Sequence, residues 1–402
     1  MKEGLNLKKK HLLILALMGV FCLTGCQDAP DPSDDIHVVT IPVTENSTEP
    51  MVKSDSAESF SDTAETIPET TELIKETKPE IPFDYTICFT GDISIEDGAW
   101  TTQKWINNGR DTFACFDKTI VEHMRNADIC LADNEFPYTT RGTPTYGKDY
   151  IYRANPENIS LMEDLGVDVL ALANNHMYDY GEQGLLDTLE TIDNTDMMRV
   201  GAGKNLEEAS ETRFVELDGL TVAFICGTRV EWEELTKGAT ETEAGVFRTV
   251  DPTLMYQRVR EAREEADLVI VYIHWGIEGV EYLEDYQETV GKELIRQGAD
   301  AVIGNHTHCL QGIEFYQGKP IVYSLGNFWF NSRTQDSVLA ELHVTGTRSD
   351  YELQLQYVPA LQSECTISYI SDPNLQYQYF RHLENISRNV SFDENGICTE
   401  ME

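Results

Sequence analysis

Residues 298–330 read GADAVIGNHTHCLQGIEFYQGKPIVYSLGNFWF, and this stretch decides the fold class. Within it, the apolar run Ala301–Gly304 predicts a short buried strand that leads straight into the polar letters NHTH. The run Ile321–Ser324 predicts another strand. The preceding Gln317-Gly318 pair predicts the turn that feeds it, because glycine adopts the positive φ that tight hairpins need. The stretch thus predicts short buried strands that end in metal-type side chains.

The same alternation of strands and helices extends outward from Phe83. The other predicted strands are Tyr85–Thr90, Asp128–Ala132, Asp168–Ala173, Thr221–Cys226 and Leu268–Ile273. The predicted helices are Phe113–Arg125, Pro156–Leu165, Glu182–Ile192, Pro252–Glu265 and Tyr286–Gln297. A second hairpin turn is expected at Asp218-Gly219. Such alternation is typical of an α/β domain with a buried central sheet.

Five of the predicted strands end in a burst of polar residues of the kinds that bind metals. Sites in α/β sheets form beyond the carboxyl ends of the strands, so five such ends side by side would gather Asp92, Glu135, Asn175, His274, His306 and His308. This mixture of carboxylate, amide and imidazole groups suits Mn, Zn or Fe. Two divalent ions about 4 Å apart would use this many ligands fully. Because His306 and His308 are two residues apart, both rings would face the same side of an extended segment.

Each of these residues also has a structural explanation when it is taken alone. The His306–His308 pair could lie on the surface, and His274 could be a hydrogen-bonded core histidine. Asn174 and Asn175 could cap the following turn, and Asp92 could be an ordinary loop residue. Their common position at strand ends favours a shared polar site that holds metal.

Several long motifs resemble the CapA family of poly-γ-glutamate capsule synthesis proteins. They are FTGDI (Phe89–Ile93), LANNHMYDYGEQGLLDTL (Leu172–Leu189), HWGIE (His274–Glu278) and the stretch Gly298–Phe330. Their order and spacing agree with the family over residues 83–345. The resemblance implies an α/β fold (an α+β sandwich) of the calcineurin-like metallophosphatase type. Such a four-layer fold has central β-sheets flanked by helices and a dinuclear site at one edge.

The resemblance also implies roles for single residues. The family's metal ligands match Asp92, Asn175, His274, His306 and His308. His176 matches a catalytic histidine that assists the leaving group or the transition state. Glu135 and Pro137 match the family's Asn-Leu-Glu-x-Pro element.

The sequence departs from the family pattern at a few positions. Asp133 stands where this element usually has Asn, which leaves open whether Asp133 or Glu135 faces the metal. Asn305 and Thr307 replace the usual residues of the last motif, and Ser94 stands where classical phosphatases have a histidine. A ligand could therefore be missing from one of two metal positions.

The N-terminus predicts export with a lipid anchor. Basic residues precede an apolar stretch, His11–Leu23, and the sequence then reads Leu-Thr-Gly-Cys up to Cys26. This is the pattern of a lipoprotein signal peptide over residues 1–25, with Cys26 as the lipidated residue. The alternative is an uncleaved membrane anchor in which the cysteine stands by chance. Either reading places the rest of the chain on the extracytoplasmic face of the cell membrane.

Composition divides the remaining chain. Residues 26–82 are acidic and rich in Ser, Thr and Pro, which predicts a disordered linker. Residues 83–345 form the predicted domain, and residues 346–402 are a poorly patterned C-terminal extension.

The net charge of −40 argues against nucleic acid as a partner. The cysteines are scattered without a CxxC pair, so those in apolar runs are read as small core residues and disulfides stay open.

Three functions remain open at the level of the sequence. The resemblance implies a role in poly-γ-glutamate capsule synthesis or export, alongside subunits of the polymer synthase. The chain could act there as a metal-dependent hydrolase or transferase on an anionic polymer or a phosphoester, or as a non-catalytic accessory subunit. The third reading is an exported phosphoesterase unrelated to the capsule.

Overall fold

The computed structural model describes residues 80–231 and 233–401. The signal peptide, Cys26 and nearly all of the predicted linker lie outside these residues, so those predictions stay predictions. Among the described residues, no helix combines the length and the apolar character needed to cross a membrane.

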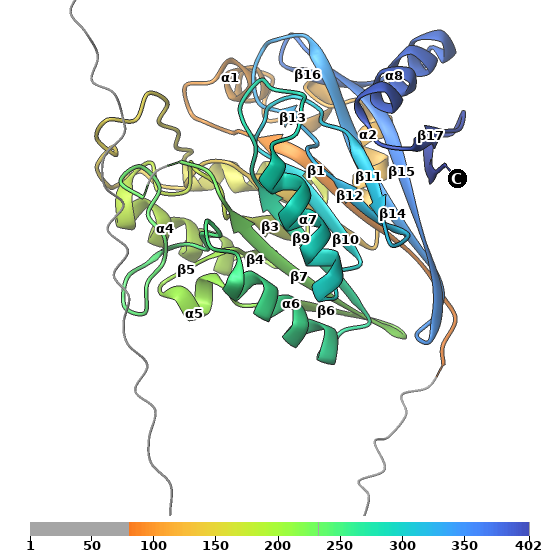
Figure 1. Ribbon diagram of the computed structural model, residues 1–402. Coiled ribbons are helices and arrows are strands. Elements are labelled where there is room, and N and C mark those ends of the chain that lie inside the picture. Colours follow the sequence, from red (N-terminus) through yellow and green to blue (C-terminus); the bar gives the residue numbers. More distant parts are fainter. Residues whose placement is uncertain (1–79, 232, 402) are drawn as a thin grey trace, which may run out of the picture. The chain divides into compact units, whose positions relative to one another are not determined.

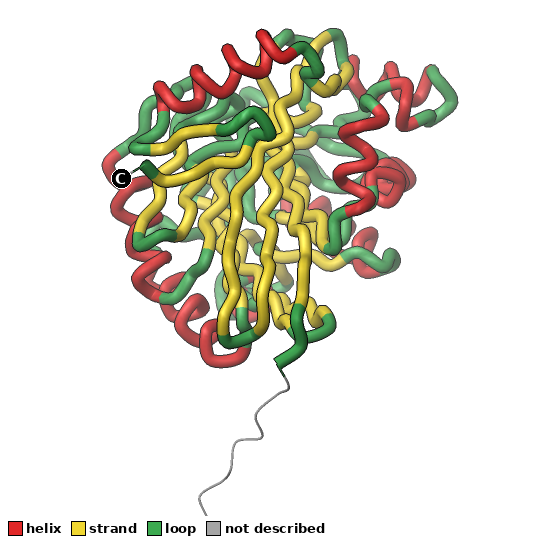
Figure 2. The backbone as a smooth tube through the Cα atoms, turned by 90° about the vertical axis from the view of Figure 1, so that its right-hand side faces the viewer, coloured by secondary structure: helices red, strands yellow, loops and turns green. Residues whose placement is uncertain are grey.

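The larger sheet of the described chain contains ten strands in the order β17-β18-β15-β14-β1-β2-β3-β4, with β13 beside β1 and β16 beside β15. These strands are β1 (Phe83–Ile93), β2 (Ile129–Asn134), β3 (Val169–Ala171), β4 (Met198–Val200), β13 (Asn327–Trp329), β14 (Gln335–Thr347), β15 (Asp350–Ser363), β16 (Thr366–Tyr369), β17 (Val390–Phe392) and β18 (Ile397–Glu400). The strands β1 to β4 run parallel, whereas β14 pairs antiparallel with both β1 and β15. Figure 2 shows the long strands of this sheet side by side (yellow).

The smaller sheet contains six described strands in the order β11-β12-β10-β9-β7-β6. These are β6 (Arg213–Leu217), β7 (Leu220–Thr228), β9 (Leu268–His274), β10 (Ala301–Asn305), β11 (Ile313–Tyr316) and β12 (Lys319–Val322). Its strands β7, β9, β10 and β12 are parallel, and both predicted hairpin turns join antiparallel pairs at its edges. A separate two-stranded ribbon pairs β5 (Ala202–Gly203) with β8 (Gly245–Val246).

Helices cover the outer faces of the two sheets. The α-helices are α1 (Trp100–Asn107), α2 (Lys118–Asn126), α3 (Ser160–Leu165), α4 (Gly181–Asp193), α5 (Leu206–Ala209), α6 (Thr253–Glu265), α7 (Asp285–Gln297) and α8 (Pro373–Ile386). Short 3-10 turns occupy η1 (Thr112–Ala114) and η2 (Pro156–Ile159). Figure 1 shows α6 and α7 lying along the smaller sheet.

Three hydrophobic cores separate the layers, because successive strand side chains point to opposite faces. In β1, Ile87 and Phe89 pack into the core between the two sheets, together with residues of β7, β9 and β10. Cys88 lies between them in sequence and packs instead with residues of α2 and α4. The third core joins the smaller sheet to α6 and α7. Helices, two sheets and helices thus form four layers, which confirms the predicted mixed α/β class with central sheets flanked by helices.

The structure refines the prediction at several points. The strand ends do not belong to one central sheet, because β1, β2 and β3 lie in the larger sheet and β9 and β10 in the smaller one. The predicted helix Phe113–Arg125 is divided into η1 and α2, since the Asp117 side chain accepts a hydrogen bond from the backbone N–H of Thr119 and caps α2.

The residues of the predicted C-terminal extension are part of the larger sheet. Residue 345, the predicted end of the domain, lies inside β14, and β15 pairs with β14 from Gln335 to Thr347. The chain then adds β16, α8, β17 and β18 to the same sheet or its face. The seven described cysteines are free, and Cys88, Cys130 and Cys226 are buried as expected.

Candidate metal centre

The predicted site residues meet at one edge of the two sheets. Asp92 lies near the end of β1, Glu135 directly follows β2, and His274 ends β9. At the end of β1, Gly91 lets the backbone pass very close to that of Gly326. A Cβ atom on Gly91 would lie 1.9 Å from the carbonyl oxygen of Gly326, the same oxygen that accepts a hydrogen bond from the backbone N–H of Asp92.

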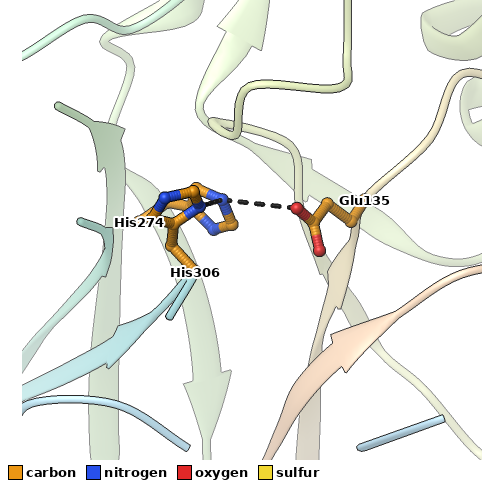
Figure 3. A group of neighbouring side chains, drawn as sticks. All are labelled: Glu135, His274 and His306. Carbon is orange, nitrogen blue, oxygen red and sulfur yellow. Dashed lines mark hydrogen bonds and ion pairs between the residues drawn. The ribbon is translucent and has the colours of Figure 1, made fainter. Parts of the chain in front are cut away.

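Carboxylate and imidazole groups from these strand ends form three overlapping clusters, each with ligand atoms within 4.8 Å of one another. The clusters are Glu135 with His274 and His306, Asp92 with Glu135 and His308, and Asp92 with Asp133 and His274. Figure 3 shows the imidazoles of His274 and His306 facing the Glu135 carboxylate. The amide oxygen of Asn175 completes the set at 2.9 Å from Nε2 of His274. All six predicted ligands therefore lie in one group, and their role as ligands stays a prediction.

Glu135 provides the physical test of whether a cation fits. Its side chain is buried and neither carboxylate oxygen has a hydrogen-bond partner. Oε1 lies 3.5 Å from Nε2 of His274 and 3.9 Å from Nε2 of His176. Burying a carboxylate without hydrogen bonds is costly. A divalent cation would relieve that cost, so the residues present fit a metal.

Asp133 and Glu135 have different surroundings. Oδ2 of Asp133 lies 3.1 Å from Nδ1 of His274, and its Oδ1 accepts a hydrogen bond of 3.0 Å from Asn174. With Nδ1 bound to Asp133, Nε2 of His274 points at the amide oxygen of Asn175 and at Nδ1 of His306, which lies 3.1 Å away. A carboxylate behind a ligand histidine is a common second partner in metal sites. The geometry therefore favours Glu135 as the ligand and Asp133 as the group that orients His274.

Burial and opposite charges shift the pKa values of this group strongly. Burial raises the pKa of Asp133 to about 7. Burial alone would lower the pKa of His274, but Asp133 and Glu135 outweigh it and raise that pKa to about 10. The pKa of His306 is lowered instead, because burial and the neighbouring charge of His274 hold it well below the usual range. A lowered pKa favours the neutral form of His306, which is the form that binds metal.

Asp92 and His308 form an ion pair of 3.0 Å between Oδ2 and Nδ1. Burial opposes both charges, but the Glu135 and Asp92 carboxylates raise the pKa of His308 to about 9. The same imidazolium more than offsets burial at Asp92 and lowers the pKa of that carboxyl. Asp92 is thus held as an anion.

The expected extended geometry of His306 and His308 is wrong. The two residues have φ values of 95° and 55°, so the chain turns immediately after β10 instead of continuing as a strand. Both rings still reach the cluster, with centroids 6.0 Å apart. The intervening Thr307 has a structural role, since its hydroxyl donates a hydrogen bond of 2.8 Å to Ser324.

His176, the predicted catalytic residue, lies beside the cluster, and Asp179 fixes the orientation of its ring. Its Nδ1 lies 2.7 Å from Oδ2 of Asp179, which leaves Nε2 facing Glu135. Asp179 in turn pairs with Lys148, at 2.8 Å between Oδ1 and Nζ, and Lys148 also pairs with Glu231 at 3.0 Å. The Lys148 side chain is only 3% exposed, and its ammonium also donates to the backbone oxygen of Asn175.

This supporting chain of charges was not predicted from the sequence. The spacing of His176 and Asp179 in a turn was a usable signal for their pairing. No local pattern marks Lys148 or Glu231, which lie in loops far apart in the sequence.

A cleft of about 610 Å³ opens on the cluster. Its lining includes His176 and His308, so a ligand in the cleft reaches two residues of the site. Ser94 lines the same cleft.

The sequence matches the model of a family described as "Bacterial capsule synthesis protein PGA_cap" over residues 86–332. The chain is 32% identical over 261 residues to "PGA biosynthesis protein CapA" of Bacillus subtilis (strain 168), and the alignment covers 64% of this chain and 67% of that protein. It is 32% identical over 233 residues to "Capsule biosynthesis protein CapA" of Bacillus anthracis, covering 55% of this chain and 56% of that protein.

The structure is also similar to that of a phosphatase from Mycoplasma pneumoniae. The TM-score is 0.44 at 11% sequence identity, and the match covers 75% of this chain and 100% of that chain.

Proposed function

Because the chain belongs to the bacterial capsule synthesis protein family PGA_cap, we propose that it takes part in the synthesis or export of a poly-γ-glutamate capsule. The names of its relatives in Bacillus subtilis and Bacillus anthracis, both capsule or PGA biosynthesis proteins, support this process. We place the chain on the extracytoplasmic face of the cell membrane, anchored by a lipid on Cys26. Its partners would be subunits of a poly-γ-glutamate synthase, and its ligand would be the anionic polymer or a phosphoester.

One observation carries the chemical part of this proposal: the buried carboxylate of Glu135 has no hydrogen-bond partner and lies among histidines. A divalent cation such as Mn, Zn or Fe would supply positive charge that binds and polarises an anionic or acyl oxygen. The residues that would hold such cations are Asp92, Glu135, Asn175, His274, His306 and His308.

The surroundings of His176 favour a catalytic role, as in a hydrolase or transferase, over a purely structural one. Asp179 fixes Nδ1, so Nε2 is the nitrogen that faces the site. From there it can donate a proton to an oxygen that leaves, or accept one from an oxygen that attacks. The ring also lines the cleft, where a ligand would contact it.

The charge of the chain makes a cation useful for this ligand. The sequence carries a formal net charge of −40, which repels a polyanion. Divalent cations are the largest local charges in most sites that hold them and can reverse the sign of the field there. A polymer carboxylate could then bind at the cluster although the rest of the surface is acidic.

The test replaces the gene in its own host by variants and measures cell-surface poly-γ-glutamate. Glu135→Gln and His308→Ala are expected to reduce the polymer at least about tenfold, while Cys26→Ala should release the protein from the membrane. Glu352→Gln serves as the control. This residue pairs with Thr345, which pairs with Asp84 at the opposite end of β1 from Asp92.

Three results would contradict parts of the proposal. Normal polymer in a deletion strain overturns the capsule role. Normal polymer with Glu135→Gln and His308→Ala overturns the metal site. Metal-dependent phosphoester hydrolysis by the purified protein, together with a normal capsule in the deletion strain, favours the exported phosphoesterase.

A further inference from the structure

The cleft beside the candidate metal centre has an aromatic wall. The ring of Tyr152 packs on His176 with centroids 4.2 Å apart, and Phe330 packs on His308 at 4.6 Å. Tyr152 and Phe330 also contact each other edge to face at 5.7 Å, and all four residues line the cleft. Tyr150 extends this wall toward solvent and is 66% exposed. Such a wall can pack against methylene groups and amide planes of an extended ligand.

Two carboxylates that belong to neither the metal cluster nor an ion pair line the same cleft. They are Glu96, which follows β1, and Glu278, which follows β9. Within residues 80–231 and 233–401, no Lys, Arg or His nitrogen lies within 4.0 Å of either carboxylate. Glu96 is half-buried and is fixed by the backbone N–H of Gly98, which donates to its Oε1 at 2.8 Å.

Both carboxylates act on the part of the cleft next to Tyr152. Burial is the largest cause that raises the pKa of Tyr152, followed by the negative charges of Glu135 and Asp179 and then by those of Glu278 and Glu96. Among the described residues that line the cleft, Arg333 is the only Lys or Arg, and it is exposed. A ligand that carries negative charges alone would therefore be repelled beside Tyr152, whereas an ammonium group would be attracted there.

We propose that the cleft binds the amine-bearing end of its ligand, with the ammonium group beside Tyr152 in the field of Glu96 and Glu278. The rest of the ligand would run along the aromatic wall toward His176 and His308. If the proposed function holds, this ligand is the α-amino end of a γ-glutamyl chain and not an interior segment. Interior residues carry a carboxylate and an amide, whereas the first residue also carries an ammonium group.

The experiment measures binding of two synthetic probes to the full chain in detergent by calorimetry, with Mn²⁺ present. One probe is a γ-glutamyl trimer with a free α-amino group, and the other is the same trimer with that group acetylated. Acetylation is expected to weaken binding about tenfold, since it removes the charge that pairs with two partly exposed carboxylates. This difference should shrink as salt is added, because salt screens exposed charges.

The matched variant is the double substitution Glu96→Gln and Glu278→Gln, with Glu352→Gln as the control. The double variant should lose about tenfold in affinity for the free-amine trimer. It should bind the acetylated trimer at least as well as the unchanged protein does, because two carboxylates that repel this trimer are removed. The control should bind both probes as the unchanged protein does. Equal affinity for the two trimers, or equal losses for both in the double variant, would overturn the proposal.

A third probe separates this proposal from the proposed function. Triglycine has a free amine but no γ-glutamyl group. If triglycine binds and depends on Glu96 and Glu278 while neither trimer binds, the amine site stands and poly-γ-glutamate is refuted as the ligand. If the trimers bind but the double variant changes nothing, the polymer stands as the ligand and the amine site is refuted.

Discussion

Oε1 of Glu135 lies 3.5 Å from Nε2 of His274, although the two residues stand at the ends of strands in different sheets. Glu135 comes directly after β2 of the larger sheet, and His274 is the last residue of β9 in the smaller one. A cation held by both residues would therefore join the two sheets at their shared edge. Metal binding should then stabilise the fold as well as supply chemistry.

The first prediction concerns this stabilisation. At a free Mn²⁺ concentration of about 100 times its Kd, the free energy of unfolding should rise by about 2.7 kcal/mol over that with chelator present. Glu135→Gln keeps the shape of the side chain but removes its charge. It should therefore weaken the binding of Mn²⁺ and reduce the difference in free energy of unfolding between Mn²⁺ and chelator. Urea denaturation with Mn²⁺ and with chelator measures it. Glu352→Gln should keep the full difference, and an unchanged difference in Glu135→Gln would refute the ligand role.

The second prediction distinguishes the roles of Asp133 and Glu135. Asp133 is already satisfied by His274 and Asn174, whereas both oxygens of Glu135 lack partners. Asp133→Asn should therefore weaken Mn²⁺ binding about tenfold, the usual effect of losing a group behind a ligand histidine. Glu135→Gln should weaken it more, because a direct ligand is lost. Calorimetric titration with Mn²⁺ measures both values, and the reverse order would exchange the two roles.

The third prediction concerns the buried ammonium group of Lys148. Lys148→Met leaves Asp179 without its cation, in a position where Asp179 is fully buried. Breaking a buried ion pair by removing one partner costs about 3–5 kcal/mol, so the free energy of unfolding should fall by an amount in this range. The matched control is Lys118→Met. Lys118 pairs with Glu122 at 3.2 Å, and both side chains are more than half exposed.

The control variant should change the free energy of unfolding by less than about 1 kcal/mol, as is usual for exposed pairs. Adding Asp179→Asn to Lys148→Met should recover part of the loss, because the unpaired charge is then removed. If Lys148→Met lowers the free energy of unfolding no more than Lys118→Met does, the buried Lys148–Asp179 pair is worth no more than an exposed one.

Local patterns in the sequence predicted the strands but not how they divide between sheets. Ile87, Cys88 and Phe89 alternate between two cores, yet all three are apolar, so β1 is predicted as a buried strand without a partner being specified. The larger sheet depends on β14 and β15, which mix polar and apolar residues and pair with each other over a long antiparallel register. The β14–β15 pairing is a local hairpin that closes at Thr347 and Asp350. The pairing of β14 with β1 is non-local, and no short window of sequence reveals it.

The site shows the same division between local and non-local information. Ligand-type residues at the ends of apolar strands were predictable, because sites form beyond the carboxyl ends of strands. The division of these strands between two sheets was not predictable. The turn at His306 and His308 was not predictable either, since residues other than glycine rarely adopt positive φ. Lys148 and Glu231 were missed because they lie in loops that only the folded chain brings together.

The last prediction concerns pH and lies outside the metal cluster. His123 of α2 lies 2.8 Å from the buried Glu341 of β14, and this hydrogen bond is the main cause that raises the pKa of His123 above 6.5. Stability from a raised histidine pKa is fully present below the unfolded value and disappears as pH rises through the folded one. The His123 side chain is 35% exposed, so the pair should contribute at most about 1 kcal/mol. His123→Gln should thus lower the free energy of unfolding at about pH 6, and this difference should vanish by about pH 9. Urea denaturation between about pH 6 and pH 9 measures this difference, with Glu341→Gln as the reciprocal variant. A difference that grows with pH would show that the His123–Glu341 pair does not stabilise the fold through a protonated His123.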